Sequence, residues 1–526
     1  MDITVNLEKI DYAVIAIYIA GILSLGFWVS FRKGHTTDLF LAGRSLGWVN
    51  IGLSMWATNT TPSSFIATAG AAYATGLITS NFALLTWPFL LLMSMVFVPH
   101  YLSTRISTMP EFMSRRYDES CRNFLSWYTI ISALVVWLGV TLYAGGILLQ
   151  QVFGWPFWVC VAVLAAVGTS FTVAGGLAAV VITDSFQCIL MVAASAVLTF
   201  MALDKVGGIS NLIEKVPADY WDIFQSGEGC EYPWYAFLLG YPILGVWFWS
   251  TDQTIIQRAL GARDIRQAQL GGFLVGATKL VDPMVFWVPG ILCLVLHPNL
   301  AEPDHAYVTM VTTYLPTGMV GLIVAVLIAA VISTVDSGLN SLSTVFSLDI
   351  YRKYFRPEAS QRLVTAVGRI TTVTAGVISA VLAMAMTAAR ANLFDLLQSV
   401  ISFMAPPMAA VFLIGVLWKR ANAKAAFWTL VVGLALSTCI GVIYLYVRDP
   451  DTWPAYLHYL LLAFYLFVGL SVLMVVVSLL TAPPPPEKAL PSLRLTYRTQ
   501  IRGAKLTWIL WAVLAAVMTA VYIVLG

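Results

Sequence analysis

The sequence WATNTTPSS, from Trp56 to Ser64, places six hydroxyl or amide side chains and one proline inside a hydrophobic run over residues 48 to 73. Proline has no backbone N–H group and leaves the carbonyl one turn earlier without its helical partner, so it interrupts a helix. Polar side chains are costly in hydrocarbon and mark sites of function. The stretch therefore predicts an interrupted membrane helix whose freed backbone groups face a polar site.

A second stretch of this kind, WSTDQT, runs from Trp249 to Thr254. Its first four letters are similar to the WATN of Trp56–Asn59. Interrupted helices at corresponding places in two halves of a chain are typical of transporters built from inverted repeats, with the site near the middle of the bilayer. A match of four residues also arises by chance, which is the competing interpretation.

The composition excludes a soluble protein. Hydrophobic residues make up 59% of the 526 residues and charged residues only 10%, against about 25% charged residues in soluble domains. Soluble enzymes and nucleic-acid binders need a charged exterior or a basic patch. The sequence has no nucleotide-binding glycine-rich motif, no paired nucleophile and base, and no CxxC pair among its six cysteines. We expect an integral membrane protein that is not an enzyme, with no disulfide framework and no zinc site.

Hydrophobic runs of about 20 residues, the length that crosses a bilayer, occur fourteen times in the chain. We therefore predict an all-α protein with about fourteen transmembrane helices. The predicted spans are 11–31, 48–73, 79–98, 124–152, 155–175, 180–203, 235–256, 270–296, 315–347, 367–389, 393–417, 425–447, 455–480 and 506–525.

The Lys and Arg residues fall mainly on one side of this topology. Of the 29 basic residues, 23 lie in alternate loops, five lie in the opposite loops, and Lys279 lies inside a helix. Cytoplasmic loops are the ones enriched in Lys and Arg, so both termini are expected outside the cell. The external loop over residues 204–233 has six acidic residues and two lysines. The short loops favour a bacterial inner membrane, and the prolines from Pro483 to Pro486 predict a stiff cytoplasmic linker.

Ionisable residues within the predicted spans are further candidates for function. At 100° per residue, Ser333, Asp336, Ser337 and Asn340 share one face of the helix over 315–347, with Thr334 at its edge. Hydroxyl, carbonyl and carboxylate oxygens suit a hard cation such as Na⁺. Asp184 lies eight residues beyond the Gly175-Gly176 pair, where we expect a break. Lys279 has Asp282 at i+3, and a purely structural ion pair is an equally good interpretation of that spacing.

Several long motifs in this order resemble those of the sodium:solute symporter family, and most closely its sodium/glucose cotransporter branch. The resemblance covers nearly the whole chain. It implies two inverted repeats of five helices, a LeuT-like fold, over residues 48–204 and 235–418, with flanking segments 1–47 and 419–526 and an external loop 205–234. The motifs are FLAGRSLGW (Phe40–Trp48), GGLAAVVITDSFQ (Gly175–Gln187), WSTDQTIIQR (Trp249–Arg258), NSLSTVFSLDIY (Asn340–Tyr351) and LFDLLQS (Leu393–Ser399), followed by APP (Ala405–Pro407).

The resemblance also implies a sodium site and a substrate site. One Na⁺ would be held by the carbonyls of Ala57, Thr60 and Ala330 and the hydroxyls of Ser333 and Thr334. A second cation site of some relatives corresponds to Asp184, Ser333, Asp336 and Ser337. Asp336 departs from the hydroxyl residue usual there, which would strengthen a second Na⁺ site or bring in a proton. The predicted substrate-binding residues are Asn59, Ser64, Thr86, Phe248, Trp249, Asp252, Lys279 and Gln398.

The expected function is sodium-coupled import of a small polar solute, a sugar or polyol, by alternating access. Some positions that bind sugar in relatives differ here, with Ser64 in place of His or Gln, Ala83 in place of Glu, and Trp137 in place of Asn. An organic acid or amino acid with Lys279 as the partner of its carboxylate is the alternative, and a cation channel is a third and weaker one. The expected partners are the solute, one or two Na⁺ ions and the lipid bilayer, with no nucleic acid and no obligate protein partner.

Overall fold

The structure is a computed structural model that describes residues 7–32, 40–60, 62–226, 230, 232–386, 393–447, 454–488 and 504–526. Helices occupy each of the fourteen predicted hydrophobic segments, and the elements named within the described ranges include no strand. The all-α prediction is confirmed. Thr61 and the part of the predicted linker beyond residue 488 lie outside the described residues.

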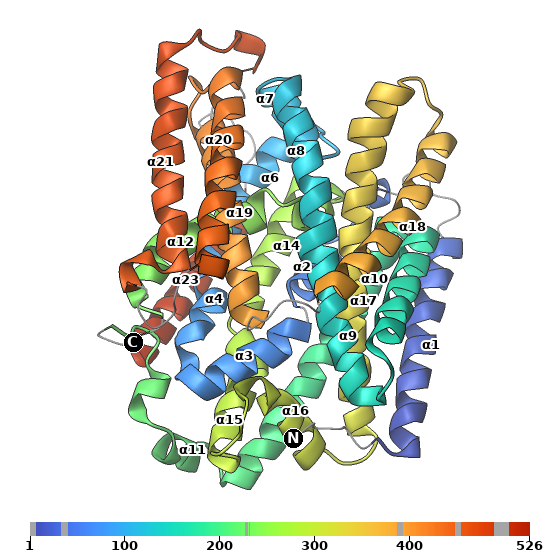
Figure 1. The fold of residues 1–526 in the computed structure, drawn as a ribbon, viewed down its shortest axis with the longest axis vertical. Coiled ribbons are helices and arrows are strands. Elements are labelled where there is room, and N and C mark those ends of the chain that lie inside the picture. Colours follow the sequence, from blue (N-terminus) through green and yellow to red (C-terminus); the bar gives the residue numbers. More distant parts are fainter. Residues whose placement is uncertain are drawn as a thin grey trace.

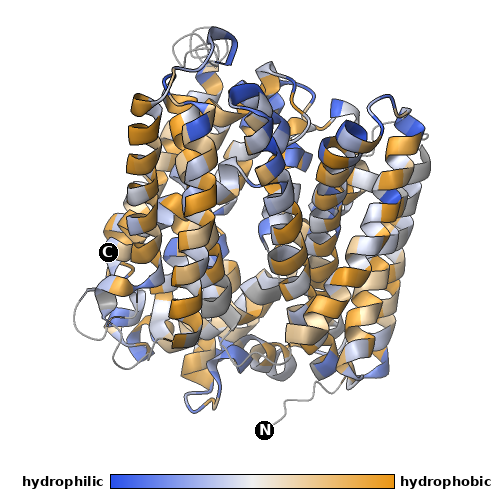
Figure 2. Cartoon of the chain, turned by 45° about the horizontal axis from the view of Figure 1, so that its top comes forward, coloured by the Kyte–Doolittle hydropathy of each residue, from blue (hydrophilic) through white to orange (hydrophobic). Residues whose placement is uncertain are grey.

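The helices stand side by side as a bundle (Figure 1). Hydrophobic residues dominate the outward faces of the bundle, while hydrophilic residues gather at its two ends (Figure 2). Within the described residues, nine helices are long and apolar enough to cross a membrane, or ten when one bent pair counts as a single span. The count of fourteen crossings stays a prediction, because several predicted spans are divided into shorter helices.

Both predicted interruptions are present. Helix α2 (Trp48–Asn59) ends at Thr60, whose backbone is extended, and α3 begins at Pro62 and runs to Thr75. Helix α12 (Trp234–Ser250) ends before Asp252, and α13 (Gln253–Leu260) follows. At the first break the N–H of Thr60 donates to the carbonyls of Trp56 and Ala57 at 3.0 and 3.1 Å. Each break thus leaves backbone groups inside the bundle, where protein surrounds them.

A glycine bends the helix that carries Asp184. Helix α10 runs from Phe157 to Val206 and covers two predicted spans, 155–175 and 180–203. Gly176 within it has φ 56° and ψ −162°, a conformation that residues with a side chain rarely adopt. The break expected at Gly175-Gly176 is therefore confirmed. Helix α17 (Met319–Val345), which carries the predicted cation ligands, packs against α10.

The span over 270–296 was predicted as one continuous helix, but in the structure it is bent. Helix α14 (Ile265–Thr278) ends just before Lys279, and the chain continues as a π-helix, η6 (Pro283–Trp287), and α15 (Val288–Leu296). The two halves meet at 43°. Pro283 explains the change, because it cannot donate the backbone hydrogen bond that would continue α14. Lys279 therefore lies at a bend beside the break in α2 and α3, since α2 packs on α14 and α3 packs on α15.

The remaining longer helices surround this centre. Their bounds are α1 Lys9–Arg32, α5 Trp87–Leu92, α6 Val98–Ser103, α7 Met109–Arg116, α8 Glu119–Ser132, α9 Val140–Phe153, α11 Ile209–Lys215, α16 Ala306–Tyr314, α18 Gln361–Ala385, α19 Leu393–Leu417, α20 Ala423–Val442, α21 Tyr459–Leu480 and α23 Lys505–Leu525. Short 3-10 or π segments connect some of them, including η2 Gly76–Ser80, η3 Met93–Phe97, η4 Ala133–Gly139, η8 Phe346–Phe355 and η10 Ile443–Val447.

A close helix contact tests this packing. A Cβ atom added to Gly290 of α15 would lie 2.0 Å from the backbone carbonyl oxygen of Ala69 on α3. We expect Gly290→Ala to destabilise the protein by about 1 to 3 kcal/mol, since backbone cannot yield as a side chain can. The control is Gly469→Ala on α21, where an added Cβ meets nothing within 4 Å. Thermal unfolding of the purified variants in detergent measures both, and equal melting temperatures for the two would contradict the packing.

Candidate functional site

A cavity of about 200 Å³ lies where the two broken helices and the α14–α15 bend meet. Aromatic side chains supply much of its wall, and a few polar groups face them, as is usual for small-molecule sites. The aromatic members of the lining are Phe82, Trp137, Tyr241, Phe248, Trp249, Phe286 and Trp287. The polar members are Asn59, Thr60, Ser64, Thr68, Thr86, Thr141, Lys279, Asp282 and Gln398.

Most of the predicted substrate-binding residues line this one cavity. The set brought together comprises Asn59, Ser64, Thr86, Phe248, Trp249, Lys279 and Gln398. Asp252 is not part of the lining. Its carboxylate accepts a hydrogen bond from the backbone N–H of Thr254 at 2.8 Å and caps the start of α13. The residue that sequence analysis grouped with the substrate site thus stabilises the restart of the second broken helix.

A buried ion pair occupies one wall of the cavity. The Nζ atom of Lys279 lies 2.7 Å from Oδ2 of Asp282 and 2.7 Å from Oδ1 of Asn59. It also lies 5.5 Å from the ring centroid of Trp249, in cation–π range. The indole Nε1 of Trp56 donates to the other carboxylate oxygen of Asp282 at 2.8 Å. The pair expected from the i+3 spacing is therefore present, and it faces the cavity.

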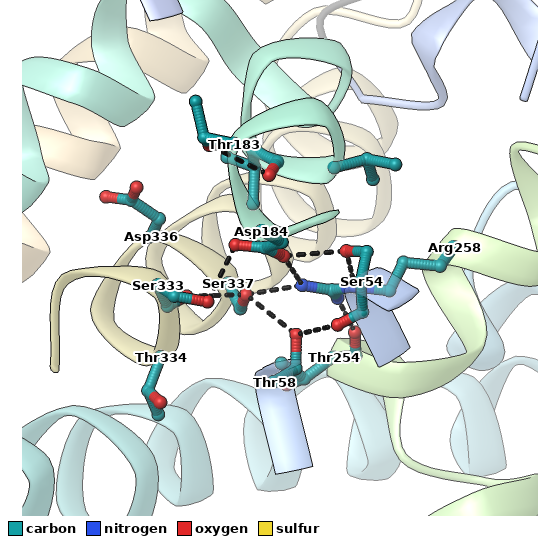
Figure 3. A network of polar contacts seen from close by, with 12 residues as sticks. Ser54, Thr58, Thr183, Asp184, Thr254, Arg258, Ser333, Thr334, Asp336 and Ser337 are labelled. Carbon is teal, nitrogen blue, oxygen red and sulfur yellow. Dashed lines mark hydrogen bonds and ion pairs between the residues drawn. The ribbon is translucent and has the colours of Figure 1, made fainter. Parts of the chain in front are cut away.

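A second polar cluster surrounds Asp184 (Figure 3). Its Oδ1 accepts from the hydroxyl of Ser333 at 2.6 Å, and its Oδ2 accepts from the hydroxyl of Ser54 at 2.6 Å. Ser54 lies on α2 and Ser333 on α17, so the carboxylate joins three helices. The hydroxyl of Thr58 lies 3.3 Å from that of Ser337, which adds a second link between α2 and α17. Thr58 belongs to the polar stretch that the sequence singled out, whereas Ser54 was not predicted.

The cation in this cluster is Arg258, which the topology assigned to a cytoplasmic loop. The predicted loop position was wrong, while the side of the membrane stays a prediction. Arg258 is buried on α13, and its Nη2 lies 3.1 Å from Oδ2 of Asp184. Its Nε donates to Ser54 at 2.7 Å, and it also donates to Ser337 and to the backbone carbonyl of Thr254. A guanidinium has five donors, which makes it suited to hold this many oxygens at once.

The five residues of the predicted sodium site are all buried, and they lie on α2, at its end, and on α17, two helices that pack against each other. The carbonyl of Ala57 accepts from the N–H of Thr60, at the end of α2. On α17 the hydroxyl of Thr334 donates to the carbonyl of Ala330 at 3.0 Å. The hydroxyl of Ser333 instead points to Asp184 (Figure 3).

Asp336 lies beside the Asp184 cluster and points away from it (Figure 3). Its Oδ1 accepts a hydrogen bond from Thr172 on the first half of α10 at 3.1 Å. Asp336 and Asp184 are both buried. Arg258 of α13 pairs with Asp184 of α10, whereas the hydrogen bond of Asp336 comes from the neutral hydroxyl of Thr172.

Known proteins with similar sequences cover almost the whole chain. A sodium/mannose cotransporter of Bos taurus is 36% identical over 91% of this chain and 88% of its own length. A sodium/glucose cotransporter 4 of Danio rerio is 34% identical over 94% of this chain and 82% of its own length. A sodium/myo-inositol cotransporter 2 of Oryctolagus cuniculus is 32% identical over 92% of this chain and 78% of its own length.

Solved structures agree on the fold. A Na⁺-coupled sialic acid symporter in a substrate-bound outward-open state has a TM-score of 0.78 at 22% identity, and the match covers 91% of this chain and 99% of that one. The nucleobase-cation symporter Mhp1 has a TM-score of 0.54 at 13% identity, and the match covers 87% of this chain and 94% of that one. The fold is thus the LeuT-like one that the sequence motifs implied. The model of the sodium:solute symporter family matches residues 39–433, and this chain belongs to that family.

Proposed function

We propose that the protein carries a sugar or polyol into the cell together with sodium ions, by alternating access. The observation that carries this proposal is the cavity at the junction of the two broken helices, where aromatic rings face amide, hydroxyl and ion-paired groups. The names of the similar proteins, cotransporters of sodium with glucose, mannose or myo-inositol, support the same solute class.

We place one Na⁺ between α2 and α17. Its proposed ligands are the carbonyls of Ala57, Thr60 and Ala330 and the hydroxyls of Ser333 and Thr334. The burial of all five supports this, as does the hydroxyl contact of Thr58 with Ser337 that links the same two helices. Neutral oxygen ligands suit a monovalent cation, because they replace its water without adding a large negative charge.

We place a second cation, a Na⁺ or a proton, at Asp184 and Asp336 with the hydroxyl of Ser337 nearby. In the described conformation Arg258 already balances the charge of Asp184. A second cation would therefore bind when Arg258 withdraws, or would bind at Asp336. Either case adds an ion to the transport cycle.

The number of ions decides how strongly the solute can be concentrated. Each Na⁺ that enters down about 100 mV contributes roughly 2.3 kcal/mol, and a tenfold concentration gradient adds about 1.4 kcal/mol. One ion then sustains an accumulation of roughly 500-fold, and two ions would square that factor. Coupling requires that Na⁺ bind more tightly to the conformation that can bind solute than to the conformation that cannot.

We also propose that both termini face the outside, in a bacterial inner membrane. The C label lies in the lower half of the molecule, toward α11, whereas α7 lies at the opposite end (Figure 1). The α7 end carries Arg115 and Arg116. Basic residues gather on the cytoplasmic side, which supports this orientation.

An organic acid or amino acid is the second candidate solute, because Lys279 faces the cavity. A cation channel is a third candidate, since the polar cluster alone does not require a solute. Purified protein in proteoliposomes separates the three. A symporter of neutral solutes shows saturable uptake of a sugar or polyol with Na⁺ outside, and this uptake disappears when K⁺ replaces Na⁺. Conductance without saturable uptake would identify a channel.

The sodium site can be tested through one hydroxyl. We expect Thr334→Val, which keeps the side-chain shape and removes the oxygen, to raise the Na⁺ concentration for half-maximal uptake by about tenfold, equivalent to ~1.4 kcal/mol. Thr374→Val on α18 is the matched control, because Thr374 also donates to the carbonyl four residues earlier but is exposed on the outside of the bundle. A half-saturating Na⁺ concentration that is equal in both variants would remove Thr334 from the site.

The second cation can be tested through Asp336. We expect Asp336→Ala to lower the Hill coefficient for Na⁺ in proteoliposome uptake toward one. The substitution removes a buried carboxylate, whose charge a bound cation or proton would balance. Repeating the assay across pH at a fixed Na⁺ concentration separates a sodium ion from a proton. An unchanged Hill coefficient together with an unchanged pH profile would eliminate the second site.

A further inference from the structure

Asp282 is the one carboxylate among the described residues that line the solute cavity, and Lys279 is the one ammonium or guanidinium group among them. Their charges cancel across a contact of 2.7 Å. The wall that meets the solute is therefore polar but close to neutral. This balance bears directly on the kind of solute that the cavity accepts.

Lys279 and Asp282 both line the cavity, and within the part of the chain that the structure describes both keep unused hydrogen-bonding capacity. Within the described residues, each oxygen of the Asp282 carboxylate accepts one hydrogen bond, from Trp56 or from Lys279, and a carboxylate oxygen can accept two. The ammonium of Lys279 has three N–H donors, of which Asn59 and Asp282 receive two. The pair therefore offers one further donor and further acceptors at neighbouring positions.

A hydroxyl group matches this pattern, because it donates one hydrogen bond and accepts others. A solute hydroxyl can donate to Asp282 while accepting from Lys279. A solute carboxylate can only accept, so it would gain from Lys279 but meet the negative charge of Asp282, which is buried and therefore weakly screened. The fixed position of the Asp282 carboxylate, held by Trp56 on α2, strengthens this discrimination.

We propose that Asp282 determines specificity by selecting neutral, hydroxyl-bearing solutes over carboxylate-bearing ones. It does so by accepting a hydrogen bond from the solute and by cancelling the charge of Lys279. This inference rests on the proposed transport of a sugar or polyol and assigns the choice between that class and organic acids to one residue.

The test compares neutral and acidic probes at a fixed Na⁺ concentration. Equilibrium binding to the purified full-length protein is measured by isothermal titration with D-glucose, D-mannose and myo-inositol, and with D-glucuronate and D-gluconate. We expect the protein to prefer at least one neutral probe over both carboxylates by about tenfold or more. Asp282→Asn, which keeps the shape and removes the charge, should reduce that ratio by about tenfold.

The matched control is Asp264→Asn. Asp264 caps the start of α14, the helix that leads to Lys279, and asparagine caps a helix as well as aspartate does. Its ratio of affinities should equal that of the unaltered protein. Tighter binding of a carboxylate than of every neutral probe by the unaltered protein would overturn the proposal, as would an unchanged ratio in Asp282→Asn. If Asp282→Asn does not fold, Lys279→Gln decides, since carboxylate affinity must then fall more than neutral affinity.

Sodium dependence is measured separately, by uptake into proteoliposomes with Na⁺ or K⁺. Uptake that is equal in both salts would overturn sodium coupling. The role of Asp282 would then still be decided by the ratio of the affinities for neutral and carboxylate probes. Sodium-dependent uptake of a carboxylate probe alone would overturn the role of Asp282 and leave sodium coupling intact.

Discussion

A chain that leaves helical geometry inside a membrane exposes backbone groups that lipid cannot hydrogen-bond, so such a break survives only where protein surrounds it. This constraint organises the molecule. The break between α2 and α3 is enclosed by α10, α14, α15 and α17, and the N–H of Thr60 is satisfied by carbonyls of its own helix. The cavity and both polar clusters lie around the two breaks because the breaks are where polar groups are tolerated.

The cluster around Asp184 shows how a buried charge is kept in such a place. A carboxylate in this interior is unfavourable unless it is paired and hydrogen-bonded, and Asp184 receives Arg258, Ser54 and Ser333 together. Losing one partner of a buried pair costs about 3 to 5 kcal/mol, because the other charge is left uncompensated. Asp184 falls within the predicted first repeat and Arg258 within the predicted second, so this contact would join the two halves that the proposed alternating access moves.

The sequence predicted the helices and both breaks because proline, glycine and hydrophobic length act locally. Through a family resemblance that assigns roles to single positions, it also named eight substrate-binding residues, of which seven line the cavity. It could not predict that Arg258 turns inward, because an arginine near a helix end is usually in water and only the tertiary structure shows Asp184 opposite it. The bend at Pro283 carried a usable signal, since a proline follows Asp282 directly, but its effect on the orientation of Asp282 depends on packing against α2.

The paired bends have a mechanical consequence. Helix α2 packs on α14 and α3 packs on α15. The two interrupted spans therefore pack against each other on both sides of their bends. Asn59 and Lys279, which are hydrogen-bonded to each other, lie at these two bends. A solute bound beside them, as proposed, would contact both interrupted spans close to their bends. Its binding would then bear on the angle between the two halves of each span, and so on the shape of a bundle many times its size.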